Sequence, residues 1–293
     1  MGKKGKIITF LANSLSIYGA LTAYTIGAGE TLKALFGGNS MLYSIIFFLI
    51  LAIVIYFSVN ALSIFESLFT PLKIIIVIIL SILLIKFVNL QNISGFSLKN
   101  LLIPYGVILF SFTGISAIPE MNEELKNKKN LLKAILIGMV ITLFIYLIFI
   151  FAVVGAVRNV NEVATLSLNN VSRGISIFGN LFALFALGTA FVALAYALKE
   201  NLLLDYKINN HKSWFIVVVV PLILTITGFF GFVKLMELTG AIALGILFSV
   251  IIIMHSKAKK LGKRKPEFTI TNNYIIKGIL FLILIMGIVY SIW

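Results

Sequence analysis

Long apolar segments alternate with short polar segments along the whole chain. Most of the apolar segments are close to the 20 residues that an α-helix needs to cross a bilayer, and the longest is expected to tilt or to extend past it. Pro71 and Pro104 fall near the starts of predicted helices, and Pro221 falls inside one. We therefore expect an all-α polytopic membrane protein. The nine predicted spans cover about residues 7–35, 41–59, 71–88, 102–119, 133–157, 176–199, 213–231, 235–255 and 274–292.

The fourth predicted span contains several residues that weaken a helix. Ser111, Thr113, Gly114 and Ser116 stand in its middle, and Pro119 closes it. In a helix interior, Gly costs about 1 kcal/mol and Pro about 3 kcal/mol relative to Ala. In hydrocarbon the freed backbone groups need partners, so a break survives only where it lines a cavity or is buried in protein. Many secondary transporters build a substrate site from such a broken helix, so transport is the leading hypothesis.

Composition and charge agree with a membrane protein and exclude several other classes. Hydrophobic residues make up 60% of the chain and charged residues 12%, a balance typical of membrane proteins. The net charge of +14 does not indicate nucleic acid, because the basic residues cluster in loops between apolar segments. With a cytoplasmic N-terminus, eighteen of the 24 Lys and Arg, Lys73 included, fall on the inner side. This predicts a multi-pass cell-membrane protein with its C-terminus outside. The absence of Cys excludes disulfides and thiolate metal sites, and no cofactor is expected.

Four segments resemble parts of a known transporter family. They are GALTAYTIGAGETL (Gly19–Leu32), PYGVILFSFTGISAIPE (Pro104–Glu120), the basic loop and helix from Lys126 to Gly155, and ALKENLLLDY (Ala197–Tyr206). As a set they resemble the amino acid permeases of the amino acid–polyamine–organocation superfamily, particularly the branch with bacterial aromatic amino acid permeases. In that resemblance they correspond to the family's third, sixth, seventh and eighth helices.

The resemblance implies a single transporter domain over residues 1–293, with a five-plus-five inverted repeat and the substrate between the broken first and sixth helices. The family's first two helices would then be absent. Residues 7–100 would keep three helices of the first repeat, 101–255 the whole second repeat, and 274–292 an extra helix. As an alternative, Ile26–Gly29 could be the break of the family's first helix and not part of its third. Against this, no Pro follows it, and only two spans separate it from the broken helix.

The candidate substrate site centres on the expected break in the fourth span. Carbonyls of the outer half would accept hydrogen bonds from a substrate ammonium group, and the inner half would point its positive N-terminal end at the cavity. Hydroxyls would add contacts, and aromatic rings would wall off the substrate side chain. A structural alternative stays open, because membrane hydroxyls commonly bond backbone carbonyls and Phe commonly faces lipid. The candidate residues are Phe110, Ser111, Thr113, Gly114, Ile115 and Ser116, with Phe112 as a further wall.

Other candidates lie outside this span. By the resemblance, the third helix faces the substrate near Tyr24 and Gly27, although small residues there also fit simple helix packing. By the same resemblance, Thr189 lies in a region that holds sodium in some relatives. None of the ten acidic residues falls convincingly at the middle of a predicted span, so Glu66 and Glu237 remain as candidates for coupling or gating.

The sequence therefore predicts secondary active transport of amino acids, neutral or aromatic, by alternating access and symport with protons or sodium ions. The expected partners are the amino acid, the coupling ion and the lipid bilayer, together with a separate chain if one supplies the first two helices. The alternative is a truncated or mis-started fragment, or one part of a split transporter, without activity alone. A membrane enzyme is not favoured, because the sequence has no His/Glu metal spacing, no nucleotide loop, and no Ser nucleophile with a His at membrane depth.

Overall fold

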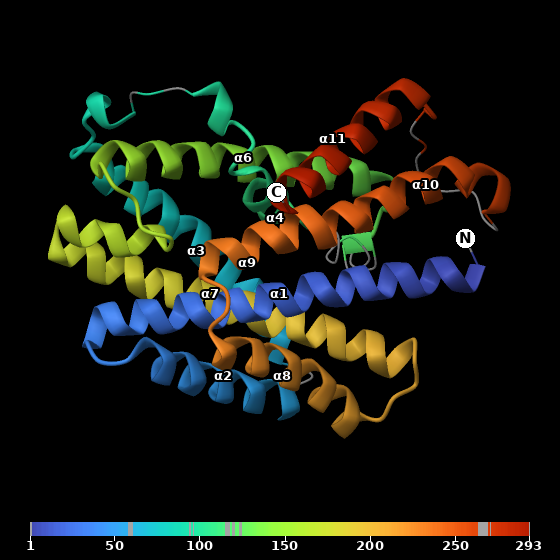
Figure 1. The fold of residues 1–293 in the computed structure, drawn as a ribbon, viewed down its shortest axis with the longest axis horizontal. Helices are drawn as coiled ribbons and strands as arrows, with labels where there is room; N and C mark the ends of the chain where they lie inside the picture. The colour runs from blue at the N-terminus through green and yellow to red at the C-terminus, as the bar shows by residue number, and fades with distance from the viewer. Residues whose placement is uncertain are drawn as a thin grey trace. The chain divides into compact units, whose positions relative to one another are not determined.

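The computed structural model describes residues 2–57, 61–93, 95, 97–114, 118, 121–122, 125–262, 269 and 271–292, with the backbone alone at 3, 61–69, 259 and 260. Helices joined by loops make up this part of the chain (Figure 1). The α-helices are α1 (Gly2–Phe36), α2 (Ser40–Phe57), α3 (Ala61–Ile85), α4 (Tyr105–Ser111), α6 (Leu131–Ala156), α7 (Arg173–Leu204), α8 (Asn210–Thr227), α9 (Phe232–Leu238), α10 (Gly245–Leu261) and α11 (Tyr274–Ile292). A π-helix, η5 (Thr239–Leu244), joins α9 to α10, and the short 3₁₀ helices are η1 (Leu90–Ile93), η2 (Leu98–Asn100), η3 (Lys128–Asn130) and η4 (Ala164–Asn170).

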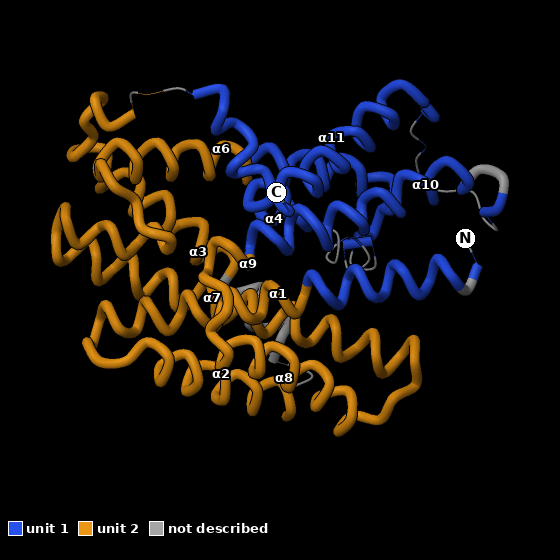
Figure 2. The backbone as a smooth tube through the Cα atoms, viewed as in Figure 1, with its two compact units in different colours: residues 1–16, 97–141, 236–293 blue, residues 17–96, 142–235 orange. Residues whose placement is uncertain are grey.

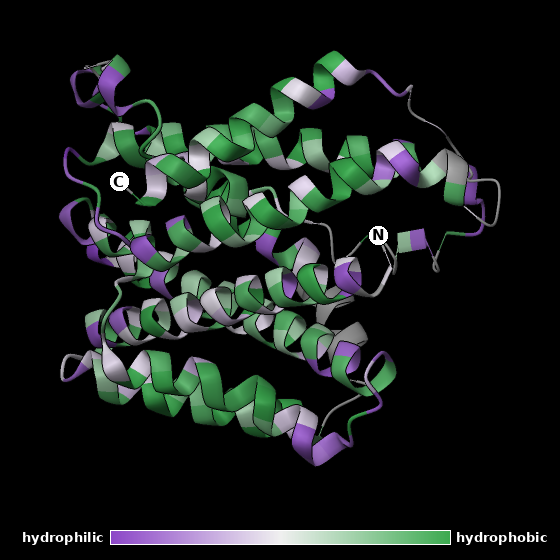
Figure 3. Cartoon of the chain, turned by 45° about the vertical axis from the view of Figure 1, so that its right-hand side comes forward, coloured by the Kyte–Doolittle hydropathy of each residue, from purple (hydrophilic) through white to green (hydrophobic). Residues whose placement is uncertain are grey.

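Every predicted span overlaps a helix in the described residues, although the fourth is helical there only at 105–111 and 118. Seven helices there are long and apolar enough to cross a membrane, and α3 adds a shorter apolar stretch, Thr70–Ile85. Figure 3 shows hydrophobic residues along the helices and hydrophilic ones gathered at helix ends and loops. Large apolar side chains such as Phe144 and Ile148 of α6 are exposed, as expected where lipid replaces water as the solvent. The all-α polytopic membrane class is confirmed.

Helix α3 differs most from its predicted span. It begins at Ala61, ten residues before the expected start, so Pro71 lies inside the helix and not near its beginning. Lys73 is consequently the central residue of α3. Lys73 lies three residues after the start of the apolar stretch Thr70–Ile85, and its placement on the inner side stays a prediction.

The chain divides into two compact units, each described by itself (Figure 2). Unit 1 comprises residues 1–16, 97–141 and 236–293, and unit 2 comprises residues 17–96 and 142–235. The boundaries fall inside α1, α6 and α9 as well as in the loop before α4. One boundary, between residues 96 and 97, lies close to the predicted repeat boundary near residue 100, and the inverted-repeat architecture stays a prediction.

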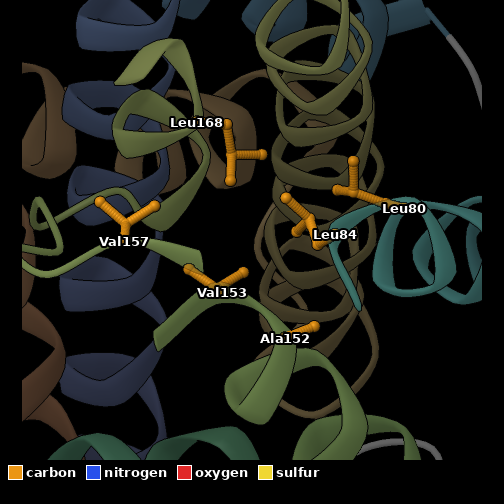
Figure 4. Close-up of a cluster of buried hydrophobic side chains, with 6 residues drawn as sticks. All are labelled: Leu80, Leu84, Ala152, Val153, Val157 and Leu168. Atoms are coloured by element: carbon orange, nitrogen blue, oxygen red, sulfur yellow. The ribbon is translucent and has the colours of Figure 1, made fainter. Parts of the chain in front are cut away.

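The core of unit 2 joins α3, α6 and η4. Its buried side chains are shown in Figure 4 and are Leu80, Leu84, Ala152, Val153, Val157 and Leu168. Gly155 lets α6 approach the end of α3 closely, because an added Cβ would lie 2.8 Å from Val88 Cγ1. Burial of such side chains stabilises each by about 1.5–3 kcal/mol, although in a membrane part of that gain comes from packing and not from water exclusion.

A buried lysine connects α7 to the end of α2. Lys199 is only 2% exposed, and its Nζ donates to the carbonyl of Ile55 at 2.9 Å and to that of Tyr56 at 3.5 Å. These carbonyls belong to the last turn of α2, where helical partners run out and negative partial charge accumulates. The ammonium group therefore caps the C-terminal end of α2.

We expect Lys199→Ala to destabilise the protein, because it leaves two buried carbonyls without their donor and opens a cavity. The loss should be about 2 kcal/mol or more in the free energy of unfolding. Thermal unfolding in detergent measures it, with Lys212→Ala, at an exposed position of α8, as the matched control. Equal melting temperatures for the two variants would show that the cap contributes nothing.

Candidate functional site

Helix α4 ends inside the apolar segment that the sequence predicts to be broken. The helix stops at Ser111, and the next two backbone N–H groups turn back: Phe112 donates to Ile108 O at 3.2 Å, and Thr113 donates to Phe110 O at 3.1 Å. Gly114 lies outside regular structure. The chain is helical again at 118 and at 121–122, so the interruption is confirmed and begins about three residues earlier than expected. Ile115 and Ser116 lie outside the described residues.

Two hydroxyl groups of the break bond to the last turn of α4. Ser111 Oγ donates to Ile108 O at 2.8 Å, and Thr113 Oγ1 donates to Leu109 O at 2.9 Å. These are the backbone bonds of the structural alternative, so the hydroxyl protons are used for the helix end in this conformation. The end of α4 nonetheless concentrates carbonyl oxygens and the negative end of a helix dipole, which suits a substrate ammonium group.

Three glycines hold α4 against its neighbours in unit 1. An added Cβ at Gly240 of η5 would overlap the carbonyl oxygen of Gly106, and one at Gly106 would overlap that of Glu237. On another side, a Cβ at Gly287 of α11 would overlap the ring of Tyr105. The contact therefore joins backbone to backbone, the close approach that small residues permit in membranes. It fixes the position at which α4 ends.

The packing partner of α4 is itself irregular. Residues Thr239–Leu244 form a π-helix inside one long apolar span, Phe232–Ala258, and π-helical turns are frequently found at functional sites. Phe110 packs against the buried cluster of Ala12, Leu244 and Leu247. Packing in unit 1 is therefore what the structure shows for Phe110. Glu237, half-buried near the end of α9, contributes its backbone carbonyl to the crossing at Gly106.

In unit 2, the candidate glycine of α1 packs against α7 and α9. A Cβ added to Gly27 would lie 2.9 Å from Cδ2 and Cε2 of Phe232 and 3.4 Å from Leu187 Cδ1. Gly27 therefore lies in close packing between α1, α7 and the first residue of α9, and its contact with substrate stays a prediction. Tyr24, one turn earlier, is half-buried.

Successive residues at the middle of α7 contact three different helices. Leu187 faces α1 at Gly27, Gly188 approaches the ring of Phe47 of α2, and Thr189 meets α3. This follows from the helical rotation of about 100° per residue. Thr189 Oγ1 donates to Ala186 O at 3.0 Å and accepts from Lys73 Nζ, also at 3.0 Å.

Lys73 is the residue that the sequence pattern missed. Its helix carries Ser63, Glu66, Ser67 and Pro71 in its first half, a composition that indicates a loop. The nine residues before Thr70 nevertheless include five large apolar side chains, a pattern that indicates a helix beginning before Pro71. They are Leu62, Ile64, Phe65, Leu68 and Phe69.

The comparison with protein families decides the class of the protein. The model of the tryptophan/tyrosine permease family matches residues 1–293. The chain belongs to this family. A member of the tryptophan/tyrosine permease family is an amino acid permease of the membrane and not an enzyme, so the broken helix and the apolar spans are those of a transporter.

A relative of the chain with a different name is also a transporter. The permease is 26% identical over 305 residues to a protein named Glutamine transporter 2 from Aliivibrio fischeri (strain ATCC 700601 / ES114). The similarity covers 94% of this chain and 74% of the relative. The resemblance to amino acid permeases is therefore confirmed, while the absence of two helices and the orientation of the termini stay predictions.

Proposed function

We propose that this permease carries amino acids with neutral side chains by alternating access, driven by a proton or sodium gradient, with its N-terminus in the cytoplasm. The observation that carries the proposal is the end of α4 at Ser111, inside an apolar segment and held there by Gly106, Gly240 and Gly287. Because backbone contacts hold α4, a ligand bound at its end would always occupy the same position. This is the arrangement that discontinuous helices give to transporters.

The chemistry around the break favours a zwitterion with a neutral side chain. Carbonyl oxygens of the last turn of α4 suit the ammonium group, and backbone N–H groups where the chain is helical again, at 118 and at 121–122, would suit the carboxylate. The side chains that flank the break, Leu109, Phe110 and Phe112, are apolar. Tryptophan, tyrosine and glutamine, the amino acids in the names of the family and the relative, all have neutral side chains.

An ion gradient supplies enough free energy for uptake. One elementary charge that moves through 100 mV releases about 2.3 kcal/mol, which supports accumulation of roughly fiftyfold at one ion per amino acid.

Counterflow in proteoliposomes tests the proposal. We expect the purified protein to exchange external labelled L-tryptophan, L-tyrosine or L-glutamine for internal unlabelled amino acid, and to leave L-lysine and L-glutamate outside. Preference for a charged amino acid would contradict the neutral substrate class. If the chain acts only with a separate chain, the purified protein would show no exchange of any of the five.

A further inference from the structure

In unit 1, the start of α1 lies beside the end of α10. Ala12 of α1 packs in one cluster with Leu244 of η5 and Leu247 of α10. Lys4 lies eight residues before Ala12, about 12 Å along α1. Lys257 lies ten residues after Leu247, about 15 Å along α10. Figure 1 shows that the two helices run in opposite directions, so both lysines lie toward the same end of unit 1.

The start of α11 reaches this end as well. Helix α11 folds back along α10, because a Cβ added to Gly245 would lie 3.1 Å from Ile288 Cδ1. At the other end of the two helices, Lys277 Nζ donates to Ser256 Oγ at 2.8 Å and also bonds to the side chain of Asn272. The ammonium group of Lys277 is therefore held against the last turns of α10. We call this surface the basic end of unit 1; its described side chains are Lys4, Lys6, Lys257 and Lys277.

The positive charge of the basic end has little compensation in the sequence. Residues 2–8 and 255–277 contain ten of the 24 Lys and Arg and only one of the ten acidic residues, Glu267. The segment that joins α7 to α8 in unit 2, residues 199–212, contains three basic residues and two acidic ones, and Lys199 among them is buried against α2. Both segments are predicted to lie on the inner side, so that location alone does not explain why one is so much more basic than the other.

Exposed apolar side chains adjoin these lysines on the same helix faces. Ile8 follows Lys4 by four residues on α1 and is 45% exposed. On α10, Ile253 precedes Lys257 by four residues and is 37% exposed. Tyr274, the first residue of α11, is 74% exposed, and tyrosine is enriched where membrane meets water. The lysines therefore stand where the aliphatic stem contacts acyl chains and the ammonium group reaches the headgroups.

We propose that the basic end of unit 1 binds the headgroups of anionic phospholipids such as phosphatidylglycerol. Ammonium groups from α1, α10 and α11 donate to the phosphodiester oxygens, and the exposed apolar side chains contact the acyl chains. A soluble anion makes only the first kind of contact, so a lipid fits this surface better than free phosphate or a soluble acidic protein. Lipid binding needs no transport, and the proposal does not depend on the proposed function.

The position of the basic end connects lipid binding to the helix that ends at the break. Helix α10 continues directly from η5, and η5 holds α4 through the contact of Gly240 with Gly106. A lipid that joins the ends of α1, α10 and α11 therefore stabilises the elements that pack around α4. Because the lipid binds this arrangement only in the folded protein, it raises the melting temperature.

Lipid binding by the purified full chain in detergent tests the proposal. The variants are Lys4→Gln/Lys257→Gln, the charge-preserving Lys4→Arg/Lys257→Arg, and the control Lys207→Gln/Lys212→Gln at exposed positions of unit 2. Native mass spectrometry gives the Kd for phosphatidylglycerol and for phosphatidylcholine with the same acyl chains. Soluble glycerophosphoglycerol, the same headgroup without acyl chains, is added as a competitor. Gel filtration reports the folding of each variant.

Wild type should bind phosphatidylglycerol about tenfold or more tightly than phosphatidylcholine. The Lys4→Gln/Lys257→Gln variant should bind phosphatidylglycerol about thirtyfold more weakly, at about fivefold per lysine removed, and the arginine variant and the control should stay within about twofold of wild type. Raising the ionic strength from about 0.05 M to about 0.5 M should weaken binding by wild type. If the double variant does not fold, Lys4→Gln alone takes its place, with an expected loss of about fivefold.

Several results would overturn the proposal: equal affinity of wild type for the two lipids, binding that salt does not weaken, unchanged affinity after the glutamine substitutions, or loss of binding in the arginine variant. Equal losses in the glutamine variant and the control would show attraction to the whole basic protein and not to this surface. Displacement of the lipid by the soluble headgroup would show a site for free phosphate. None of these results involves transport, so each leaves the proposed function untouched.

Discussion

Replacing Gly114 by leucine is expected to abolish amino acid uptake while the protein still inserts and folds. Gly114 lies just beyond the end of α4, and no described atom comes within 4 Å of a Cβ added there. We therefore expect the larger side chain to leave the packing of the described part of unit 1 unchanged. It would, however, occupy the break in which we propose that the substrate binds. We expect uptake to fall to the level of vesicles without protein.

Gly138→Leu is the matched control for this experiment. Gly138 lies in α6, in the same unit, and an added Cβ there also meets no described atom within 4 Å. A substitution on such an open surface should change uptake by no more than about twofold. Expression and size-exclusion profiles of both variants report folding. Normal uptake by Gly114→Leu would remove the break from the substrate path.

Gly240→Ala should disrupt the contact that holds α4 in place. Its Cβ would overlap the carbonyl oxygen of Gly106 and lie 3.1 Å from the backbone nitrogen of Phe110. Backbone atoms of a helix cannot turn aside as a flexible side chain does, so α4 must move away from η5. Overpacking of this kind costs about 3 kcal/mol or more where nothing yields. We expect a lower melting temperature in detergent together with a loss of uptake.

Gly278→Ala provides the comparison for Gly240→Ala. Gly278 lies in α11, also in unit 1, where an added Cβ meets open space. Alanine is the better helix former by about 1 kcal/mol, so this variant should be at least as stable as wild type. If Gly240→Ala melted at the same temperature as Gly278→Ala, the glycine contact would not determine where α4 ends.

The membrane spans could be predicted because their signal is local. A run of about 20 apolar residues has few alternatives to a spanning helix, and a described helix overlaps each of the nine predicted spans. The break in the fourth span could also be predicted, since Gly114 and its neighbouring hydroxyls weaken a helix wherever they occur. Its exact onset at Ser111 could not, because it depends on how Gly106 packs against η5.

The rest of the site depends on contacts between distant residues. Lys73 and Thr189 are 116 residues apart, and no local pattern pairs them. The polar first half of α3 resembles a loop, so the sequence gave no reason to expect Lys73 to bond to a residue of α7. Likewise, no local pattern predicts that the ring of Phe232, about 200 residues away, packs against Gly27.

Thiol labelling at Thr113 tests most directly whether the break of α4 binds the amino acid. The chain has no Cys, so Thr113→Cys places one reactive thiol beside Gly114, and Thr271→Cys places one at an exposed position of unit 1. If the account is right, a saturating concentration of the transported amino acid slows labelling of the thiol at 113 by a maleimide about tenfold or more, and leaves the thiol at 271 unaffected. Labelling at 113 that proceeds equally fast with and without the amino acid would contradict it.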